Sequence, residues 1–69
     1  MLEKIVLING SHYEYKEPLS VFGLLIYLGF NTRLILIDYN GCILPKKEWR
    51  QVLIKNNDQI EIITFAGGG

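Results

Sequence analysis

The stretch Gln59–Phe65, QIEIITF, decides the fold, and it runs directly into an alanine and three glycines. Its residues Ile60 and Ile62 are two positions apart with Glu61 between them, which is the period of a strand that buries one face. Ile63 and Phe65 share the opposite face, because successive side chains of a strand point to opposite sides of the sheet. Ile60 and Ile62 become buried only if this strand pairs near the centre of a sheet. We therefore expect the last strand to be central and the glycines to project from its end.

Two Asn-Gly dipeptides, at 9–10 and 40–41, predict tight hairpins earlier in the chain. Asn-Gly tolerates the positive φ angles of the two-residue turns that suit the twist of paired strands. The flanking segments are apolar or rich in β-branched and aromatic residues, as strands are. We expect the hairpins to join these strands: 5–8 with 11–15, and 33–39 with 42–44.

Between the hairpins the apolar period changes from two to about 3.6, which predicts one helix. Ser20 can cap its N-terminus, and Gly29 can adopt the left-handed conformation that ends it. Phe22 and Ile26 form an apolar flank beside the core-facing stripe, so they are either a docking patch or part of a wide buried face. The core-facing stripe itself consists of Val21, Leu24, Leu25 and Leu28.

The remaining segment begins with Pro45, which favours a short helical turn over 46–50. Trp49 in this turn is expected to close the core. The order strand, strand, helix, strand, short strand, helical turn, strand predicts an α+β protein of the β-grasp (ubiquitin-like) type if the last strand lies parallel to the first. It would have a mixed sheet of four to five strands, with one main helix packed on one face and a short helical turn. We expect residues 1–65 to form this domain and residues 66–69 to be a flexible glycine tail.

Composition excludes several classes of function. The chain has 69 residues with seven basic and seven acidic side chains, so no net charge is available to hold nucleic acid or an anionic membrane. The apolar run Ile5–Ile8 is far shorter than a signal-peptide core or a membrane span. The single cysteine, Cys42, excludes an internal disulfide and fits a reducing compartment. We expect a soluble, intracellular protein, in the cytoplasm or, if the gene is in an organelle, in the plastid stroma.

Catalytic chemistry is not indicated by the side chains. His12 has no cysteine or second histidine spaced for a metal, so we expect no metal site. Cys42 has no evident activating neighbour and is expected to pack rather than react. The carboxylates are scattered through strands and turns without forming an acid-base pair. We therefore predict that the protein is not an enzyme and has no catalytic residue.

The C-terminal carboxylate of Gly69 is the one group whose chemistry the sequence favours. Joining a carboxylate to AMP gives its carbon a good leaving group, and glycine adds no side chain that would block attack. Gly67 and Gly68 can pass through a channel too narrow for other residues, and residues 66–69 reach about 14 Å when extended. Ordering such a tail has an entropic cost, so an apolar contact on the domain is expected to add affinity. The candidates for this docking contact are Phe65, Ile63, Phe22 and Ile26.

Several motifs together resemble the small ubiquitin-like sulfur carriers of the ThiS family, over nearly the whole chain. The Pro45–Trp49 segment and the terminal diglycine are the specific parts of this resemblance. Gly67, a third glycine before the terminal diglycine, is a minor departure from the pattern of the family. The motifs that carry it are Ile8-Asn9-Gly10, Ser20-Val21 with Leu24-Leu25, Leu44-Pro45 with Lys46-Lys47-Glu48-Trp49, Asp58 ahead of Ile60-Glu61-Ile62, and Phe65-Ala66-Gly67-Gly68-Gly69.

The resemblance implies a mechanism and partners. An E1-like enzyme would use ATP to adenylate Gly69, sulfur from a cysteine desulfurase would displace AMP, and the resulting thiocarboxylate would donate its sulfur to thiazole synthase in thiamine biosynthesis. The chain itself would bind no cofactor. Three alternatives stay open at this stage: a carrier for molybdopterin synthesis or tRNA thiolation, a ubiquitin-like protein modifier, and a plain β-grasp interaction module with idle glycines.

Overall fold

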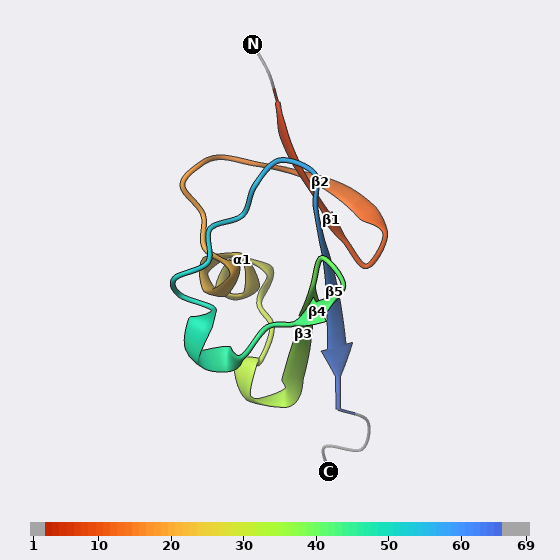
Figure 1. The fold of residues 1–69 in the computed structure, drawn as a ribbon, viewed down its shortest axis with the longest axis vertical. Coiled ribbons are helices and arrows are strands. Elements are labelled where there is room, and N and C mark those ends of the chain that lie inside the picture. The colour runs from red at the N-terminus through yellow and green to blue at the C-terminus, as the bar shows by residue number, and fades with distance from the viewer. Residues whose placement is uncertain (1–2, 66–69) are drawn as a thin grey trace.

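A computed structural model describes residues 3–65 of the chain, and they form one mixed sheet with a helix against it (Figure 1). The sheet has five strands in the order β2-β1-β5-β3-β4. β1 and β5 are parallel, and the other neighbouring strands are antiparallel. The elements are β1 (Lys4–Ile8), β2 (Ser11–Tyr15), α1 (Val21–Leu28), a 3₁₀ turn (Thr32–Leu34), β3 (Ile35–Tyr39), β4 (Cys42–Ile43), a second 3₁₀ turn (Lys46–Glu48) and β5 (Asp58–Thr64).

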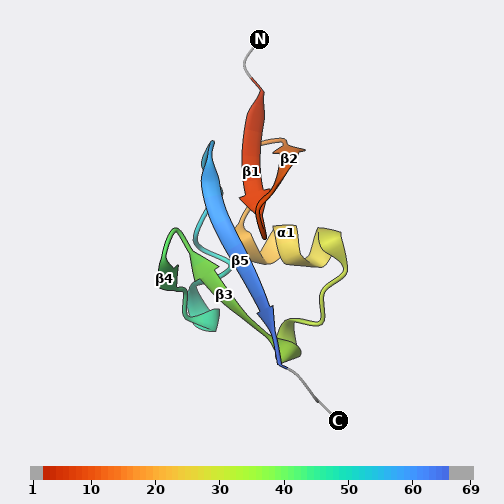
Figure 2. The same ribbon diagram turned by 90° about the vertical axis from the view of Figure 1, so that its right-hand side faces the viewer.

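The predicted central position of the last strand is confirmed, because β5 lies between β1 and β3. α1 follows the β1-β2 hairpin and packs on one face of the sheet (Figure 2). The first and last strands are parallel, which is the condition under which the sequence predicts a β-grasp arrangement, so the predicted fold is confirmed. We call the face under α1 the inner face and the opposite one the outer face.

The ends of α1 follow from local chemistry. Ser20 Oγ accepts a hydrogen bond from the backbone N–H of Gly23 at 2.9 Å, which satisfies one free donor of the first turn. Gly29 has φ +83°, in the left-handed region, and the N–H of Phe30 donates to the carbonyl of Leu25 at 3.1 Å. Both predicted caps are therefore confirmed.

The core lies between α1 and the inner face, and it is almost entirely apolar. Trp49 is 1% exposed, and its Nε1–H donates to the carbonyl of Leu44 at 2.9 Å, so its one polar atom is satisfied. The prediction that Trp49 closes the core is confirmed. The buried apolar residues are Val6, Ile8, Val21, Leu24, Leu25, Ile35, Ile37, Trp49, Ile54, Ile60 and Ile62.

Two local predictions were wrong. The third strand begins at Ile35 rather than Arg33, because the Asn31 side chain accepts from the N–H of Arg33 at 3.0 Å and caps a 3₁₀ turn first. Cys42 is exposed instead of packed, because β4 is a two-residue strand at the edge of the sheet. Within residues 3–65, no helix is long and apolar enough to cross a membrane.

Candidate functional site

The site that the sequence predicts begins at the C-terminal end of β5. Ile63 faces Leu36 of β3 across the ladder, and the N–H of Phe65 donates to the carbonyl of Leu34 at 2.9 Å. The chain is thus held against the β3 side up to Phe65, the last described residue. The predicted reactive residue Gly69, and Gly67 and Gly68 before it, lie outside the described residues.

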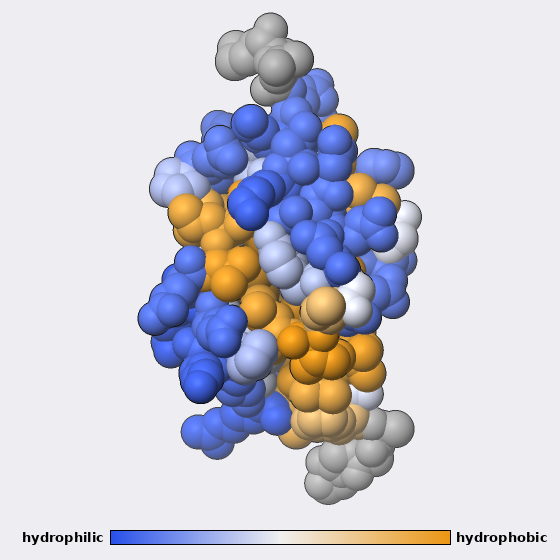
Figure 3. Space-filling view, viewed as in Figure 1, coloured by the Kyte–Doolittle hydropathy of each residue, from blue (hydrophilic) through white to orange (hydrophobic). Residues whose placement is uncertain are grey.

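An apolar patch occupies the outer face beside this end, and we call it the outer patch. Its four side chains are between 40% and 56% exposed. Figure 3 shows an apolar region over the part of the molecule where β3 and the end of β5 lie in Figure 1. The four residues of the outer patch are Leu36, Ile43, Ile63 and Phe65.

Two carboxylates border the outer patch. Asp38 of β3 is the register partner of both Glu61 of β5 and Ile43 of β4, so all three side chains lie on the outer face. Side chains directly opposite each other in a sheet are close neighbours, so the negative charges of Asp38 and Glu61 reinforce one another. The outer patch is therefore apolar towards the C-terminus and acidic towards the middle of the sheet.

The four predicted docking residues are not all brought together. Ile63 and Phe65 lie in the outer patch, as their alternation predicted. Phe22 and Ile26 belong to α1, on the other side of the sheet. Phe22 packs against the core, with the guanidinium carbon of Arg50 4.0 Å from its ring centroid, whereas Ile26 is 54% exposed. The helix flank is thus a separate surface.

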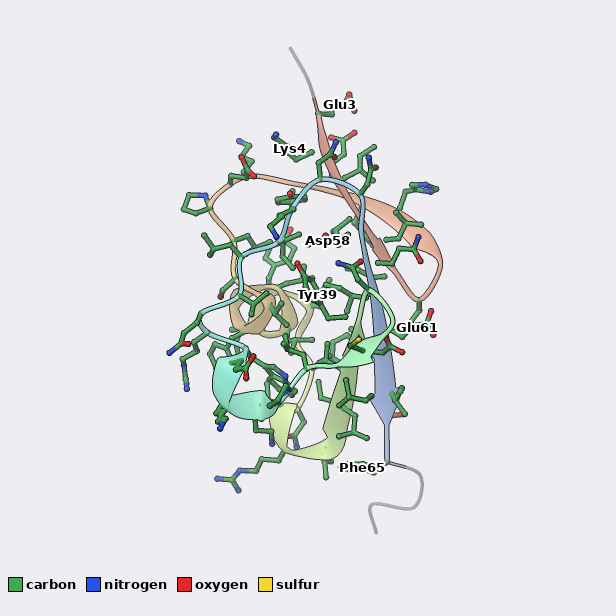
Figure 4. All side chains as sticks on the ribbon, viewed as in Figure 1. Glu3, Lys4, Tyr39, Asp58, Glu61 and Phe65 are labelled. Carbon is green, nitrogen blue, oxygen red and sulfur yellow. The ribbon has the colours of Figure 1, made fainter. Side chains whose placement is uncertain are left out.

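The other end of β5 carries a polar cluster that the sequence did not predict (Figure 4). The Asp58 side chain is buried, with the residue 7% exposed, and it accepts hydrogen bonds from the Tyr39 hydroxyl, from Asn40 Nδ2 at 3.1 Å and from the N–H of Lys55 at 2.7 Å. Burial, and then the hydrogen bond to Asp58, raise the pKa of Tyr39 well above its usual value. The hydroxyl therefore stays protonated and continues to donate.

Both hairpin turns also bind β5 through their asparagines. Asn9 Oδ1 accepts from the N–H of Ile62 at 2.7 Å, and Asn40 Oδ1 accepts from the N–H of Gln59 at 2.8 Å. Both asparagines have positive φ, 50° and 53°, which asparagine tolerates better than most residues. The Asn-Gly signal predicted the turns, but not that their side chains would extend the sheet.

Side chains that could catalyse a reaction are not gathered in the described part of the chain. His12 and Cys42 are both exposed, on β2 and β4 at opposite edges of the sheet. Among residues 3–65, no three His, Cys, Asp or Glu side chains are placed to hold a metal ion. Within residues 3–65, the arrangement places an apolar patch beside the last described residue, Phe65, and gathers no metal-holding cluster there.

Comparisons with known proteins agree with this geometry. The protein named ycf40 of Trieres chinensis is 42% identical over 66 residues, which cover 96% of this chain and 90% of that protein. A thiazole synthase of Paramagnetospirillum magneticum is 34% identical over 64 residues, which cover 93% of this chain but 20% of the synthase. A sulfur-carrier-like segment thus occurs in one chain with thiazole synthase in a homologue.

A solved structure matches as well. The crystal structure of the thiamine biosynthesis protein ThiS from Geobacter metallireducens superimposes with a TM-score of 0.81 at 26% identity, covering 94% of this chain and 99% of that one. The profile of the ThiS family matches residues 6–69, which include the glycine tail. Proteins of this family are typically not enzymes. The chain therefore belongs to the ThiS family of sulfur carriers of thiamine biosynthesis.

Proposed function

We propose that this protein carries sulfur to thiazole synthase as a thiocarboxylate at Gly69. An E1-like enzyme joins the Gly69 carboxylate to AMP from ATP and releases pyrophosphate. The persulfide sulfur that originates from a cysteine desulfurase then displaces AMP, and a second thiol reduces the resulting acyl disulfide, leaving a disulfide on the donor side. The C–S bond thus replaces one C–O bond of the carboxylate. Thiazole synthase takes this sulfur, and the chain returns with its carboxylate. ATP is thus a substrate of the partner enzyme, not a cofactor of this protein.

One observation carries this proposal: the central strand of the domain leads straight into the glycine tail. β5 is paired with β1 and β3, Phe65 is hydrogen-bonded to Leu34, and residues 66–69 follow directly in the sequence. Such a strand holds Phe65, the residue before the tail, in a fixed position against β3. We assign residues 1–65 to the domain and residues 66–69 to an arm that enters the active site of a partner.

The outer patch supplies the docking contact beside this arm. Its residues Ile63 and Phe65 are the last two outer-face residues before the tail, so a partner that receives Gly69 must pass close to them. The bordering carboxylates Asp38 and Glu61 complement a basic side chain at the edge of the partner surface. We therefore assign docking to the outer patch rather than to Phe22 and Ile26.

Thiazole synthase is the partner that the relatives support best. A homologue that contains both segments in one chain supports their acting on the same substrate. The ycf40 relatives are plastid-encoded, which supports the plastid stroma over the cytoplasm as the compartment of this protein.

The test is the mass of the intact chain after incubation with the adenylating enzyme, ATP and a sulfur source. We expect the mass to increase by the replacement of one oxygen by sulfur, and fragmentation to locate the sulfur at Gly69. A chain of unchanged mass would contradict the proposal. A covalent adduct on a lysine of another protein would indicate a protein modifier instead.

A further inference from the structure

β5 is paired on both sides over only its first half. Its parallel pairing with β1 ends where Ile8 meets Ile60, because the chain of β1 turns away at Asn9. Its antiparallel pairing with β3 continues to Thr64, which meets Ile35. Figure 2 shows the second half of β5 with β3 along one side, after β1 has ended. Beyond Ile60, the other side of β5 is an edge.

The hydrogen bonds show which backbone groups face this edge. The carbonyl of Ile60 and the N–H of Ile62 bond to Asn9, on the β1 side, whereas the N–H of Phe65 bonds to Leu34, on the β3 side. Backbone groups of successive strand residues point to opposite sides, so Thr64 has the orientation of Ile60 and Ile62. The carbonyl of Ile62 and both backbone groups of Thr64 therefore face the β1 side. Among residues 3–65, no strand pairs with them there.

This edge lacks the features that usually protect an edge strand. The exposed edge strand β2 carries charged and polar side chains, which discourage pairing with another chain. The segment from Ile62 to Phe65 has no charged side chain and no proline, and it adjoins the outer patch. The polar residues of β2 and the segment after it are Ser11, His12, Glu14, Lys16 and Glu17.

We propose that the edge of β5 from Ile62 to Thr64 binds an extended segment of thiazole synthase as an additional strand, an inference that rests on the proposed function. The four residues after Phe65 reach only about 14 Å, so the enzyme that receives Gly69 must come close to this edge. Pairing with an added strand uses main-chain hydrogen bonds and requires little of the partner's sequence.

The amide of Thr64 allows a direct test, because a 69-residue chain can be made by chemical synthesis. Replacing Thr64 by its α-hydroxy acid turns its N–H into an ester oxygen and leaves every side chain in place. We expect the synthase to bind this chain about three- to tenfold more weakly, as the loss of one hydrogen bond predicts. Equal affinities would overturn the proposal, and weaker binding to the adenylating enzyme alone would overturn the assignment to the synthase.

The matched control is the same replacement at His12 on the edge strand β2. The backbone carbonyl of Ile5 accepts from the N–H of Asn57, so the backbone groups of Ile5 and of Leu7 face β5. Leu7 is the register partner of His12, and the backbone N–H of His12 therefore points away from β1. This ester also removes an N–H from a free edge, and it weakens the neighbouring carbonyl in the same way. We expect unchanged affinity for the synthase, and an equal loss from both esters would overturn the proposal.

Amide hydrogen exchange of the unmodified chain is an independent measurement that needs no variant. The N–H of Thr64 is expected to exchange at least tenfold more slowly in the complex with thiazole synthase than in the free chain. Exchange at an unchanged rate in the complex would overturn the added strand while leaving the proposed function intact. Failure of the unmodified thiocarboxylated chain to bind the synthase at all would contradict the proposed function, and the edge proposal with it.

Discussion

The two ends of β5 differ in almost every respect. At its start, the Asp58 carboxylate is buried and accepts three hydrogen bonds, and the strand is paired on both sides. At its end, Ile63 and Phe65 are 43% and 48% exposed, and Thr64 has a paired strand on the β3 side alone. The same strand is thus fixed at one end and accessible at the other.

This difference assigns separate tasks to the two ends. Buried polar groups that are fully hydrogen-bonded fix one arrangement of the backbone, here the register of β5 between its neighbours. Exposed apolar groups contribute little to folding and are available to a partner. Substitutions at the start of β5 should therefore change stability, and substitutions at its end should change function.

Deletion of Gly68 and Gly69 tests the contrast most strongly. We expect complete loss of thiocarboxylate formation, because the reactive carboxylate would move to Gly67 and fall short of the adenylating site. The free energy of unfolding should change by less than about 0.5 kcal/mol, since the buried core lies within residues 3–65. Intact-mass analysis and urea unfolding check the two parts. A truncated chain that still gains sulfur would exclude Gly69 as the carrier.

Asp58→Ala is the corresponding change at the fixed end. It leaves the Tyr39 hydroxyl, Asn40 Nδ2 and the N–H of Lys55 without their acceptor, so we expect a loss of about 3 kcal/mol in the free energy of unfolding. Urea unfolding measures it. Glu61→Ala, which removes an exposed carboxylate from the same strand, is the control and should cost less than about 0.5 kcal/mol. Equal effects of the two changes would show that the cluster does not fix the strand.

Ile63→Ser tests the accessible end without touching the tail. We expect about tenfold weaker binding to thiazole synthase, because an apolar contact of the outer patch is lost, and little change in stability for a side chain that is 43% exposed. Titration calorimetry against the synthase measures the affinity. Ile26→Ser on α1 is the control, and it should bind as the unchanged chain does. The reverse result would move the docking surface to the helix flank.

Asn9 bonds to the middle of β5, and loss of its side-chain hydrogen bond alone should give the smallest of these effects. Asn9→Gly keeps the positive φ but removes the hydrogen bond to the N–H of Ile62, so we expect a loss of about 1 kcal/mol in the free energy of unfolding. Asn9→Ala also places a less suitable residue at φ 50°, so its free energy of unfolding should fall by about 1 kcal/mol more. Thermal unfolding distinguishes them. If the two variants were equally stable, the positive φ of Asn9 would make no contribution to stability, and the side-chain hydrogen bond would account for the whole effect.

The elements of the β-grasp fold and their order could be predicted because short-range signals mark them. Ser20 and Gly29 mark the ends of α1 through contacts within four residues, and the Asn-Gly dipeptides mark both turns. The alternation in Gln59–Phe65 indicated which side chains are buried and which form the outer patch. Each of these signals is local, whereas the parallel pairing of β1 with β5 joins segments far apart in the sequence and was a condition of the prediction.

The polar cluster could not be predicted, because its partners are far apart in the sequence. Asp58 accepts hydrogen bonds from the N–H of Lys55 and from the side chains of Tyr39 and Asn40, which are 19 and 18 residues away. Only the pairing of β3 with β5 brings these groups together. The open edge beyond Ile60 escaped prediction for the same reason, since it depends on where β1 ends relative to β5.

The most direct test of the account is sulfur transfer in a single turnover. The purified chain with an isotopically labelled thiocarboxylate at Gly69 is mixed with thiazole synthase and its other substrates. We predict that the label appears in the thiazole product and that the chain returns to a carboxylate. The proposed function would be contradicted if the label stayed on the chain in the presence of thiazole synthase and was instead transferred by a molybdopterin synthase subunit or a tRNA-thiolating enzyme.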